Sequence, residues 1–160
     1  MTSNRSFFLI VLLFLAAGCT KPAGDYLFQS AETARERGGR YEFQLSLEDS
    51  TRQYETFLAA RLVTSRIPGG NIVLDVQVTS PEGETAIERL TLPLGDPDAA
   101  RIALGSGSLA DYQWPWRTLR PSGAQLGTWQ VAVVPTDPET ADAFYGFGLS
   151  YEGTPWEKGN

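Results

Sequence analysis

The residue types that carry most enzyme and metal chemistry are scarce in this sequence. The chain of 160 residues has no histidine and a single cysteine, Cys19. Without histidine it lacks the commonest general base and metal ligand, and it cannot form a Ser-His-Asp or Cys-His arrangement. Zinc, haem and iron–sulfur centres also lose their usual ligands. The sequence therefore predicts a protein that is not an enzyme and that has no catalytic residues, no metal and no cofactor.

Carboxylates leave two alternatives open. Glycoside hydrolysis needs two acids ~5–10 Å apart in a cleft, and nothing in the sequence singles out such a pair among its 19 acidic residues. Calcium binds oxygen ligands from loops, and Asp96, Asp98 and Asp111 flank a glycine-rich stretch. Their spacing does not fit the helix–loop–helix calcium motif, and Asp-Pro and Gly-Ser are also ordinary turn residues.

Aromatic residues suggest a binding surface. Tyr112, Trp114 and Trp116 lie in one short segment, and the two tryptophans are two residues apart, which is the spacing of one strand face. With Trp129 they could stack sugars, but aromatic residues also fill sandwich cores. A platform for a glycan or peptidoglycan requires both tryptophans to face solvent, whereas core packing requires them to face inward.

Two glycines in the last expected strand are also informative. Gly146 and Gly148 share one face of the segment 144–151, opposite a second face made of Tyr145, Phe147, Leu149 and Tyr151. Glycine within a strand marks close backbone approach or a bulge. The glycines therefore indicate either tight packing against a neighbouring segment or a flat surface where a partner docks.

The N-terminus has the three parts of a secretory signal. A short polar start with Arg5 precedes an unbroken apolar run over residues 7–17, and Gly18 and Cys19 follow. The run is too short for a transmembrane helix, which needs ~20 apolar residues. The sequence therefore predicts a signal peptide over residues 1–18.

The signal ends in LAAGC (residues 15–19), which resembles the lipobox of bacterial lipoproteins, with Ala16 at the usual leucine position. The resemblance implies that Cys19 is acylated, with chains such as palmitate, and becomes the new N-terminus. Two acyl chains make a stable membrane anchor. Because Thr20 stands where aspartate retains some lipoproteins at the inner membrane, and no acidic run follows, we expect the outer membrane and its periplasmic face.

The length and charge of the chain that remains after cleavage indicate a single domain without a basic face. Removal of residues 1–18 leaves 142 residues, the length of one domain, and loss of Arg5 takes the formal net charge from −6 to −7. The basic residues form no stripe, and this excludes a nucleic-acid-binding face.

Alternation of apolar and polar residues dominates from Arg40 onward. Expected strands lie at 41–47, 54–63 (or a short helix), 72–79, 85–94, 112–117, 129–134 and 144–151. Pro115 places its strand at an edge or a bulge. The pattern predicts an all-β fold, an antiparallel β-sandwich of about seven to eight strands, immunoglobulin-like or jelly-roll-like.

The expected boundaries follow from these elements. Residues 19–39 are predicted to be a lipidated tether and lead-in, with a short strand or turn around Tyr26 and one helical turn within 31–39. The sandwich is expected over 40–152, and a polar tail over 153–160.

Several short motifs occur in a particular order behind the lipobox. They are LEDSTRQY (47–54), Arg61, Pro-x-Gly (81–83), Pro-Leu-Gly-Asp (93–96), a glycine-rich stretch with a following acid (105–111), Gly-x-Trp (127–129) and Gly-Phe-Gly-Leu (146–149). In this order they resemble the gliding-motility lipoproteins of the GldH type. Of that family's Tyr-Pro-Tyr-x-Asn-Leu loop, Pro68 and Asn71 are present and both tyrosines are absent.

The resemblance implies a non-enzymatic envelope lipoprotein of the gliding machinery. Its expected partners are membrane lipid, through Cys19, and other envelope proteins. The alternative is a module that binds carbohydrate or peptidoglycan through exposed tryptophans. The residues expected at a binding surface are Tyr112, Trp114, Trp116, Gly146 and Gly148.

Overall fold

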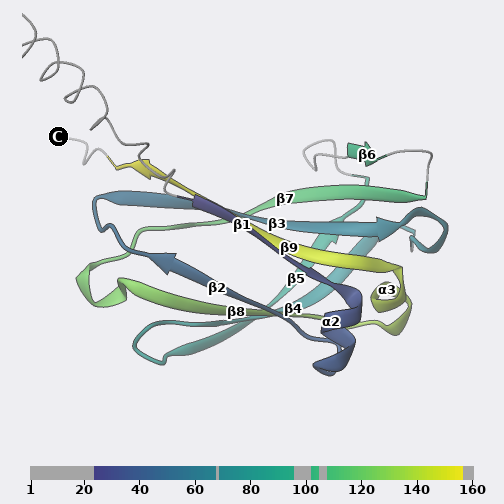
Figure 1. Cartoon of the computed structure of the whole chain (residues 1–160), viewed down its shortest axis with the longest axis horizontal. Helices are drawn as coiled ribbons and strands as arrows, with labels where there is room; N and C mark the ends of the chain where they lie inside the picture. Colours follow the sequence, from purple (N-terminus) through teal and green to yellow (C-terminus); the bar gives the residue numbers. More distant parts are fainter. Residues whose placement is uncertain (1–23, 68, 96–101, 105–107, 157–160) are drawn as a thin grey trace, which may run out of the picture.

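Period-two alternation gives strands with one buried and one exposed side, and these strands pack as two layers (Figure 1). The computed structural model describes residues 24–67, 69–95, 102–104 and 108–156. The predicted signal peptide, Cys19, Asp96 and Asp98 lie outside the described residues. Within the described part, no helix is long and apolar enough to cross a bilayer.

Both sheets are antiparallel throughout, which confirms the predicted β-sandwich. The five-stranded sheet has the order β1 (Gly24–Ser30), β9 (Phe144–Pro155), β3 (Arg52–Val63), β7 (Leu109–Leu119), β6 (Ile102–Leu104). The four-stranded sheet has the order β2 (Tyr41–Leu47), β8 (Gly127–Pro135), β4 (Asn71–Thr79), β5 (Thr85–Pro93).

Helical structure in the described residues is confined to short connections. Helix α2 (Ala31–Glu36) joins the two sheets, and α3 (Pro138–Ala143) precedes β9. Two 3₁₀ turns, η1 (Thr64–Arg66) and η2 (Gly123–Gln125), follow β3 and precede β8. The Ser30 hydroxyl caps α2 by accepting a hydrogen bond from the Thr33 N–H, 3.2 Å away.

The core lies between the sheets and is almost wholly apolar. Alternate residues of the inner strands have no exposed surface: Leu45, Leu47, Leu58, Leu62, Ile72, Leu74, Val76, Val133, Phe147 and Leu149. Each fully buried side chain of this kind contributes about 1.5–3 kcal/mol by leaving water. The rings of Tyr41, Phe43 and Phe144 surround Phe147, with centroids 5.7–6.3 Å from its ring.

Two expected boundaries are wrong. Residues 24–36 were expected to be lead-in, with a short strand or turn around Tyr26 and one helical turn within 31–39. They form β1 and α2, and β1 belongs to the sandwich because it pairs along its whole length with β9. The sandwich therefore begins before residue 40. At the other end β9 continues past residue 152 to Pro155. The segment expected as a strand or short helix at 54–63 is a strand, β3.

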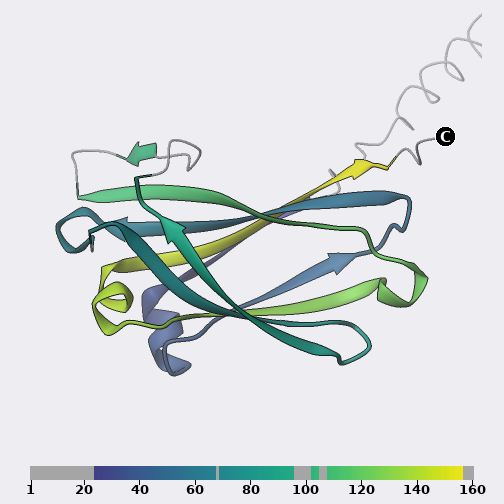
Figure 2. The ribbon, with the colours of Figure 1, turned by 180° about the vertical axis from the view of Figure 1, so that it is seen from behind.

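Side chains close both sides of the sandwich. At the β1 side, the Gln29 amide donates to the Glu42 carbonyl (2.7 Å) and accepts from the Glu42 N–H (2.9 Å), so it takes the place of a neighbouring strand on the β2 edge. At the other side, β5 rises towards β7 (Figure 2), and the Trp114 indole donates to the Pro93 carbonyl at 2.9 Å.

Candidate binding face

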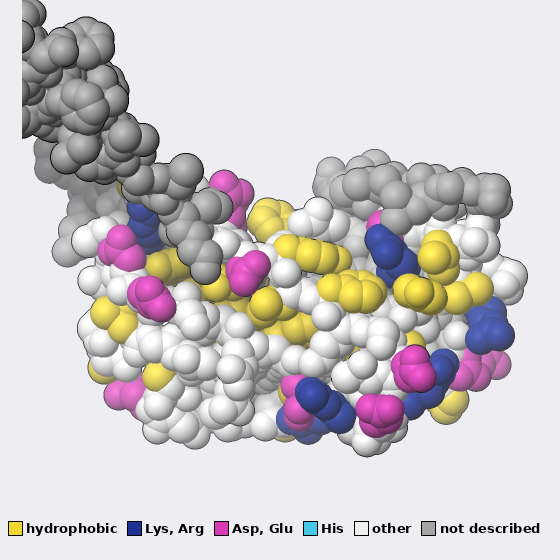
Figure 3. All heavy atoms as spheres, viewed as in Figure 1, with side chains coloured by type: hydrophobic (Ala, Val, Ile, Leu, Met, Phe, Trp, Pro, Cys, Tyr) yellow, Lys and Arg dark blue, Asp and Glu magenta, His cyan; other side chains and the backbone are white. Residues whose placement is uncertain are grey.

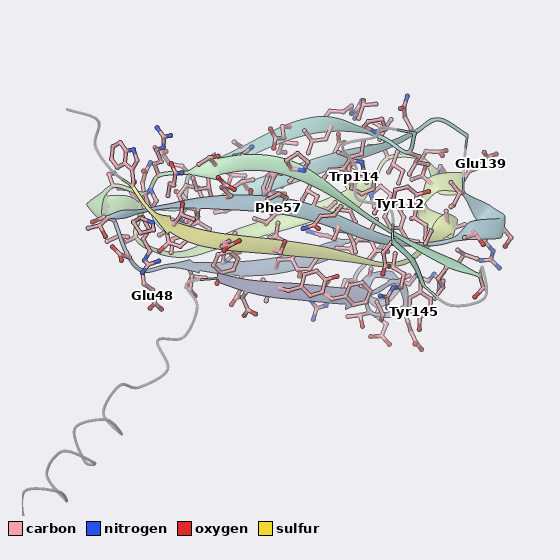
Figure 4. All side chains as sticks on the ribbon, turned by 90° about the horizontal axis from the view of Figure 1, so that it is seen from above. Glu48, Phe57, Tyr112, Trp114, Glu139 and Tyr145 are labelled. Carbon is pink, nitrogen blue, oxygen red and sulfur yellow. The ribbon has the colours of Figure 1, made fainter. Side chains whose placement is uncertain are left out.

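The outer side of the five-stranded sheet carries its side chains in registered rows. One row contains Tyr26, Ser150, Phe57 and Pro115, on β1, β9, β3 and β7 respectively. The next contains Phe28, Gly148, Ala59 and Gln113, and the one after it Ser30, Gly146, Arg61 and Asp111. Figure 4 looks down on this side, and Figure 3 shows hydrophobic side chains in a band along the same sheet.

Four aromatic side chains define what we call the aromatic face. Tyr26 is 57% exposed, Tyr145 51% and Phe28 39%, and Phe57 is partly buried. Tyr26 and Phe28 stack at a centroid distance of 6.4 Å. Isolated exposed apolar residues are common on proteins, but several aromatic residues on one side of a sheet mark a candidate interaction surface.

Gly146 and Gly148 are what allow β1 to place its aromatic rings here. A Cβ atom at Gly146 would lie 2.2 Å from Cζ of Phe28, and one at Gly148 would lie 2.9 Å from the Tyr26 hydroxyl oxygen. The rings therefore lie across the glycines, in the space that side chains would fill. The expected flat glycine surface is covered, so the interpretation of tight packing against a neighbouring segment holds, and the exposed surface is aromatic.

Tyr145 reaches this side because of a bulge. The register of β3 and β9 shifts between Arg61, opposite Gly146, and Leu62, opposite Phe144, so that Tyr145 has no partner on β3. A bulge re-aims a side chain in this way. Strict alternation predicted Tyr145 on the same face as Phe147, and that prediction is wrong, because Phe147 is buried and Tyr145 is exposed.

An ion pair lies beside the aromatic rings. The Arg61 guanidinium donates to both carboxylate oxygens of Asp111, from Nε at 2.7 Å and Nη2 at 2.9 Å, and it lies 5.7 Å from the centre of the Phe28 ring. The hydrogen bonds to Asp111 raise the pKa of the Arg61 guanidinium. The Asp111 carboxylate is thus paired with a cation, and the other two acids of the calcium hypothesis, Asp96 and Asp98, lie outside the described residues.

Arg61 and Asp111 also border a shallow hollow of about 190 Å³, whose other walls include Tyr26, Ala59 and Gln113. Burial raises the pKa of the Tyr26 hydroxyl, and the Asp111 carboxylate adds to this effect. Among the described residues, no group of three or more His, Cys, Asp or Glu side chains could hold a metal ion. The face therefore offers apolar contact, hydrogen bonding and charge.

The predicted tryptophan platform is wrong. Trp114 and Tyr112 are 3% and 4% exposed, and they stack in the core with a centroid distance of 5.6 Å (Figure 4). Pro115 interrupts the pairing of β7 with β3, and Trp116 falls in the resulting bulge. There it is partly buried, donates to the Glu88 carboxylate at 2.6 Å and lies under the Arg117 guanidinium. A glycan stacked on both tryptophans has no surface to occupy.

The outer side of the four-stranded sheet differs in chemistry. A hollow of about 320 Å³ there is lined mainly by polar side chains, including Gln44, Gln77 and Gln130. Arg40 crosses it and donates to the Gln77 amide oxygen at 3.0 Å. This polar side provides matched control positions for experiments on the aromatic face.

Most residues of the candidate face were not predicted from the sequence. Gly146 and Gly148 were expected at a binding surface, whereas Tyr26, Phe28, Phe57 and Tyr145 were not. A usable signal was the pair of strand glycines themselves, because they leave room for large side chains from a neighbouring strand.

No protein-family model matches the chain, and no curated protein matches it.

Proposed function

We propose that this protein is a lipid-anchored, non-enzymatic envelope protein that acts through protein–protein contacts made by its aromatic face, as a component of gliding-motility machinery. The observation that carries the proposal is the group of four aromatic side chains beside the Arg61–Asp111 ion pair on one side of the sheet. Tyrosine, phenylalanine and arginine are enriched at interfaces, where a few buried anchors supply most of the binding energy.

The position of the anchor supports the same function. Cys19 precedes Gly24, the first residue of β1, by five residues, which span at most about 17 Å when extended. The strand that carries Tyr26 and Phe28 is therefore held close to the membrane surface. Partners in or on that membrane would meet the face at high effective concentration.

The choice of gliding machinery rests on the ordered motifs that resemble GldH-type lipoproteins. Two of those motifs meet on the candidate face, because Arg61 pairs with Asp111, the acid that follows the glycine-rich stretch. The Gly-Phe-Gly-Leu motif provides Gly146 and Gly148 beneath the rings of β1. The proposed location is the periplasmic side of the outer membrane.

Site-specific photo-cross-linking in the protein's own cells tests this function. A photoreactive benzoylphenylalanine replaces Tyr145 or Phe57 on the aromatic face, and Gln44 or Thr85 on the polar side as matched controls. We expect adducts with envelope proteins at Tyr145 and Phe57 and few at the control positions. Equal labelling of both sides, or recovery of glycan with no protein, would contradict the proposal.

A further inference from the structure

The aromatic face ends in two glutamates that face each other. Glu55 on β3 is directly opposite Glu152 on β9, and both are exposed. Like charges directly opposite each other in a sheet are destabilising. Their outer neighbours in the same row are Gly24 on β1 and Thr118 on β7, so neither flanking strand brings a cation.

Three other acidic residues of the sheets each have an arginine partner. Asp111 opposes Arg61 and Asp75 opposes Arg89 at the same kind of cross-strand position, and Glu88 pairs with Arg117. Within the described residues, Glu55 and Glu152 take part in no ion pair of this kind. Among the residues that the structure describes, the row of Glu55 and Glu152 is therefore an electrostatic cost that no basic side chain offsets.

This acidic row adjoins the aromatic rings. Glu55 and Glu152 lie two residues from Phe57 and Ser150, in the row that also contains Tyr26. Two residues along a strand correspond to about 7 Å. One bound segment can therefore contact the carboxylates and the aromatic rings together.

We infer that the aromatic face docks a protein segment that places a lysine or arginine side chain between Glu55 and Glu152 and an adjacent apolar side chain on Tyr26 and Phe57. A cation shared by two carboxylates removes their repulsion and adds charge-assisted hydrogen bonds. This inference rests on the proposed function and adds the chemistry of the partner.

Two other occupants fit less well. Calcium requires 6–8 oxygen ligands, and the described residues place no third acidic, histidine or cysteine side chain with this pair. An anionic membrane surface would be repelled by the two carboxylates. A basic protein segment satisfies both the charge and the aromatic rings.

The experiment compares the Tyr145 photo-cross-link in the otherwise unchanged chain with that in the double variant Glu55→Gln, Glu152→Gln. The matched control is Glu82→Gln, Glu84→Gln, which removes the same charge from the exposed turn between β4 and β5. We expect the adduct to fall about tenfold in the first double variant and to be unchanged in the second. Charge reversal of the partner lysine that a carbodiimide cross-link (below) joins to Glu55 or Glu152 should abolish the adduct, and Glu55→Lys, Glu152→Lys should restore it.

A second readout locates the contact. A zero-length carbodiimide cross-link, which joins a carboxylate to a lysine amine, should connect Glu55 or Glu152 to a lysine of the same partner peptide. Thermal unfolding of the Glu55→Gln, Glu152→Gln variant should show a Tm equal to or above that of the unchanged protein, because the substitutions remove the repulsion between the two carboxylates. Loss of the adduct without loss of stability separates a binding role from a structural one.

The outcomes distinguish the two proposals. An undiminished Tyr145 adduct in the Glu55→Gln, Glu152→Gln variant, or an adduct that depends on added calcium, overturns the inference and leaves the proposed function standing. Absence of any Tyr145 or Phe57 adduct in the unchanged chain overturns the proposed function itself.

Discussion

Tyr41 is buried at the start of β2, where it is 3% exposed and contacts the rings of Phe144 and Phe147. Burial raises the pKa of its hydroxyl from 10.0 to about 12, because the phenolate would lose water. A folded-state pKa above the unfolded one gives stability that is present below pH 10 and is lost as the pH rises towards 12.

We therefore expect Tyr41→Phe to remove much of the alkaline loss of stability between pH 10 and 12, of the order of 2 kcal/mol. Urea unfolding at several pH values measures the difference from the unchanged protein. Tyr145→Phe, at an exposed position, is the control, and its free energy of unfolding should depend on pH as in the unchanged protein. The same alkaline loss in Tyr41→Phe would show that other groups cause it.

The strength of the Arg61–Asp111 ion pair can also be predicted. The two side chains are 33% and 27% exposed and meet through two hydrogen bonds. A double-mutant cycle with Arg61→Ala and Asp111→Ala should give a coupling free energy of about 1 kcal/mol, the upper end of the range for ion pairs near the surface.

The Asp75–Arg89 pair has almost the same geometry, with distances of 2.8 and 2.9 Å, but Arg89 is 67% exposed. Solvent and salt screen it more strongly, so its cycle should give a smaller coupling. Equal couplings in the two cycles would mean that the setting of Arg61 beside Phe28 adds nothing.

Residue identity alone did not reveal which aromatic side chains face solvent. Around Trp114 the alternation of Asp111 and Gln113 with Tyr112 and Trp114 already places both aromatic rings inward, as observed. The platform hypothesis gave weight to the tryptophans and ignored their polar neighbours. Trp116 could not be placed by counting, because the bulge at Pro115 breaks the period of two.

Among elements, β1 depends on the glycines of β9. A methyl group at residue 146 would collide with the Phe28 ring and would lie 2.7 Å from the Gln29 carbonyl oxygen. We expect Gly146→Ala to destabilise the fold by about 1–3 kcal/mol. In a Phe28→Ala background the cost should be smaller but not zero, because the carbonyl contact remains.

Denaturant unfolding of the four proteins in this cycle measures the effect. Gly123→Ala is the control, since its Cβ would have no heavy atom within 4 Å. Identical costs of Gly146→Ala in the two backgrounds would show that the ring does not rest on the glycine.

The strands whose exposed sides are polar were predictable from sequence. β2 alternates buried and exposed residues without exception, and β4 nearly so. For β1 only a short strand or turn around Tyr26 was predicted, and its exposed side was not. Its outward residues are Tyr26 and Phe28 and its inward residue is Leu27, so polarity does not alternate. The aromatic face was missed for the same reason that makes it a candidate site: apolar side chains stand where solvated ones are usual.

At the scale of the whole molecule, the anchor should decide where the domain resides. We expect Cys19→Ser to abolish incorporation of labelled palmitate and to release the protein from the membrane fraction, because each buried CH₂ of an acyl chain is worth about 0.8 kcal/mol. Cell fractionation with immunoblotting measures this. Thr20→Ala keeps the cysteine and should remain membrane-bound; a Cys19→Ser protein that also stays in the membrane fraction would contradict the anchor.

The pairing of β1 with β9 has a consequence for the time at which the fold can form. β1 has one neighbour in its sheet, and that neighbour contains residues 144–155, so Gly24 meets Glu152. A chain is synthesised and exported from its N-terminus onward, and strand pairings between residues far apart in the sequence form slowly. Strand β1 must therefore wait, unpaired, until β9, the last strand of the described residues, has emerged. A chain that is interrupted before β9 leaves β1 without its neighbouring strand, so the backbone N–H and C=O groups of β1 have no strand to pair with.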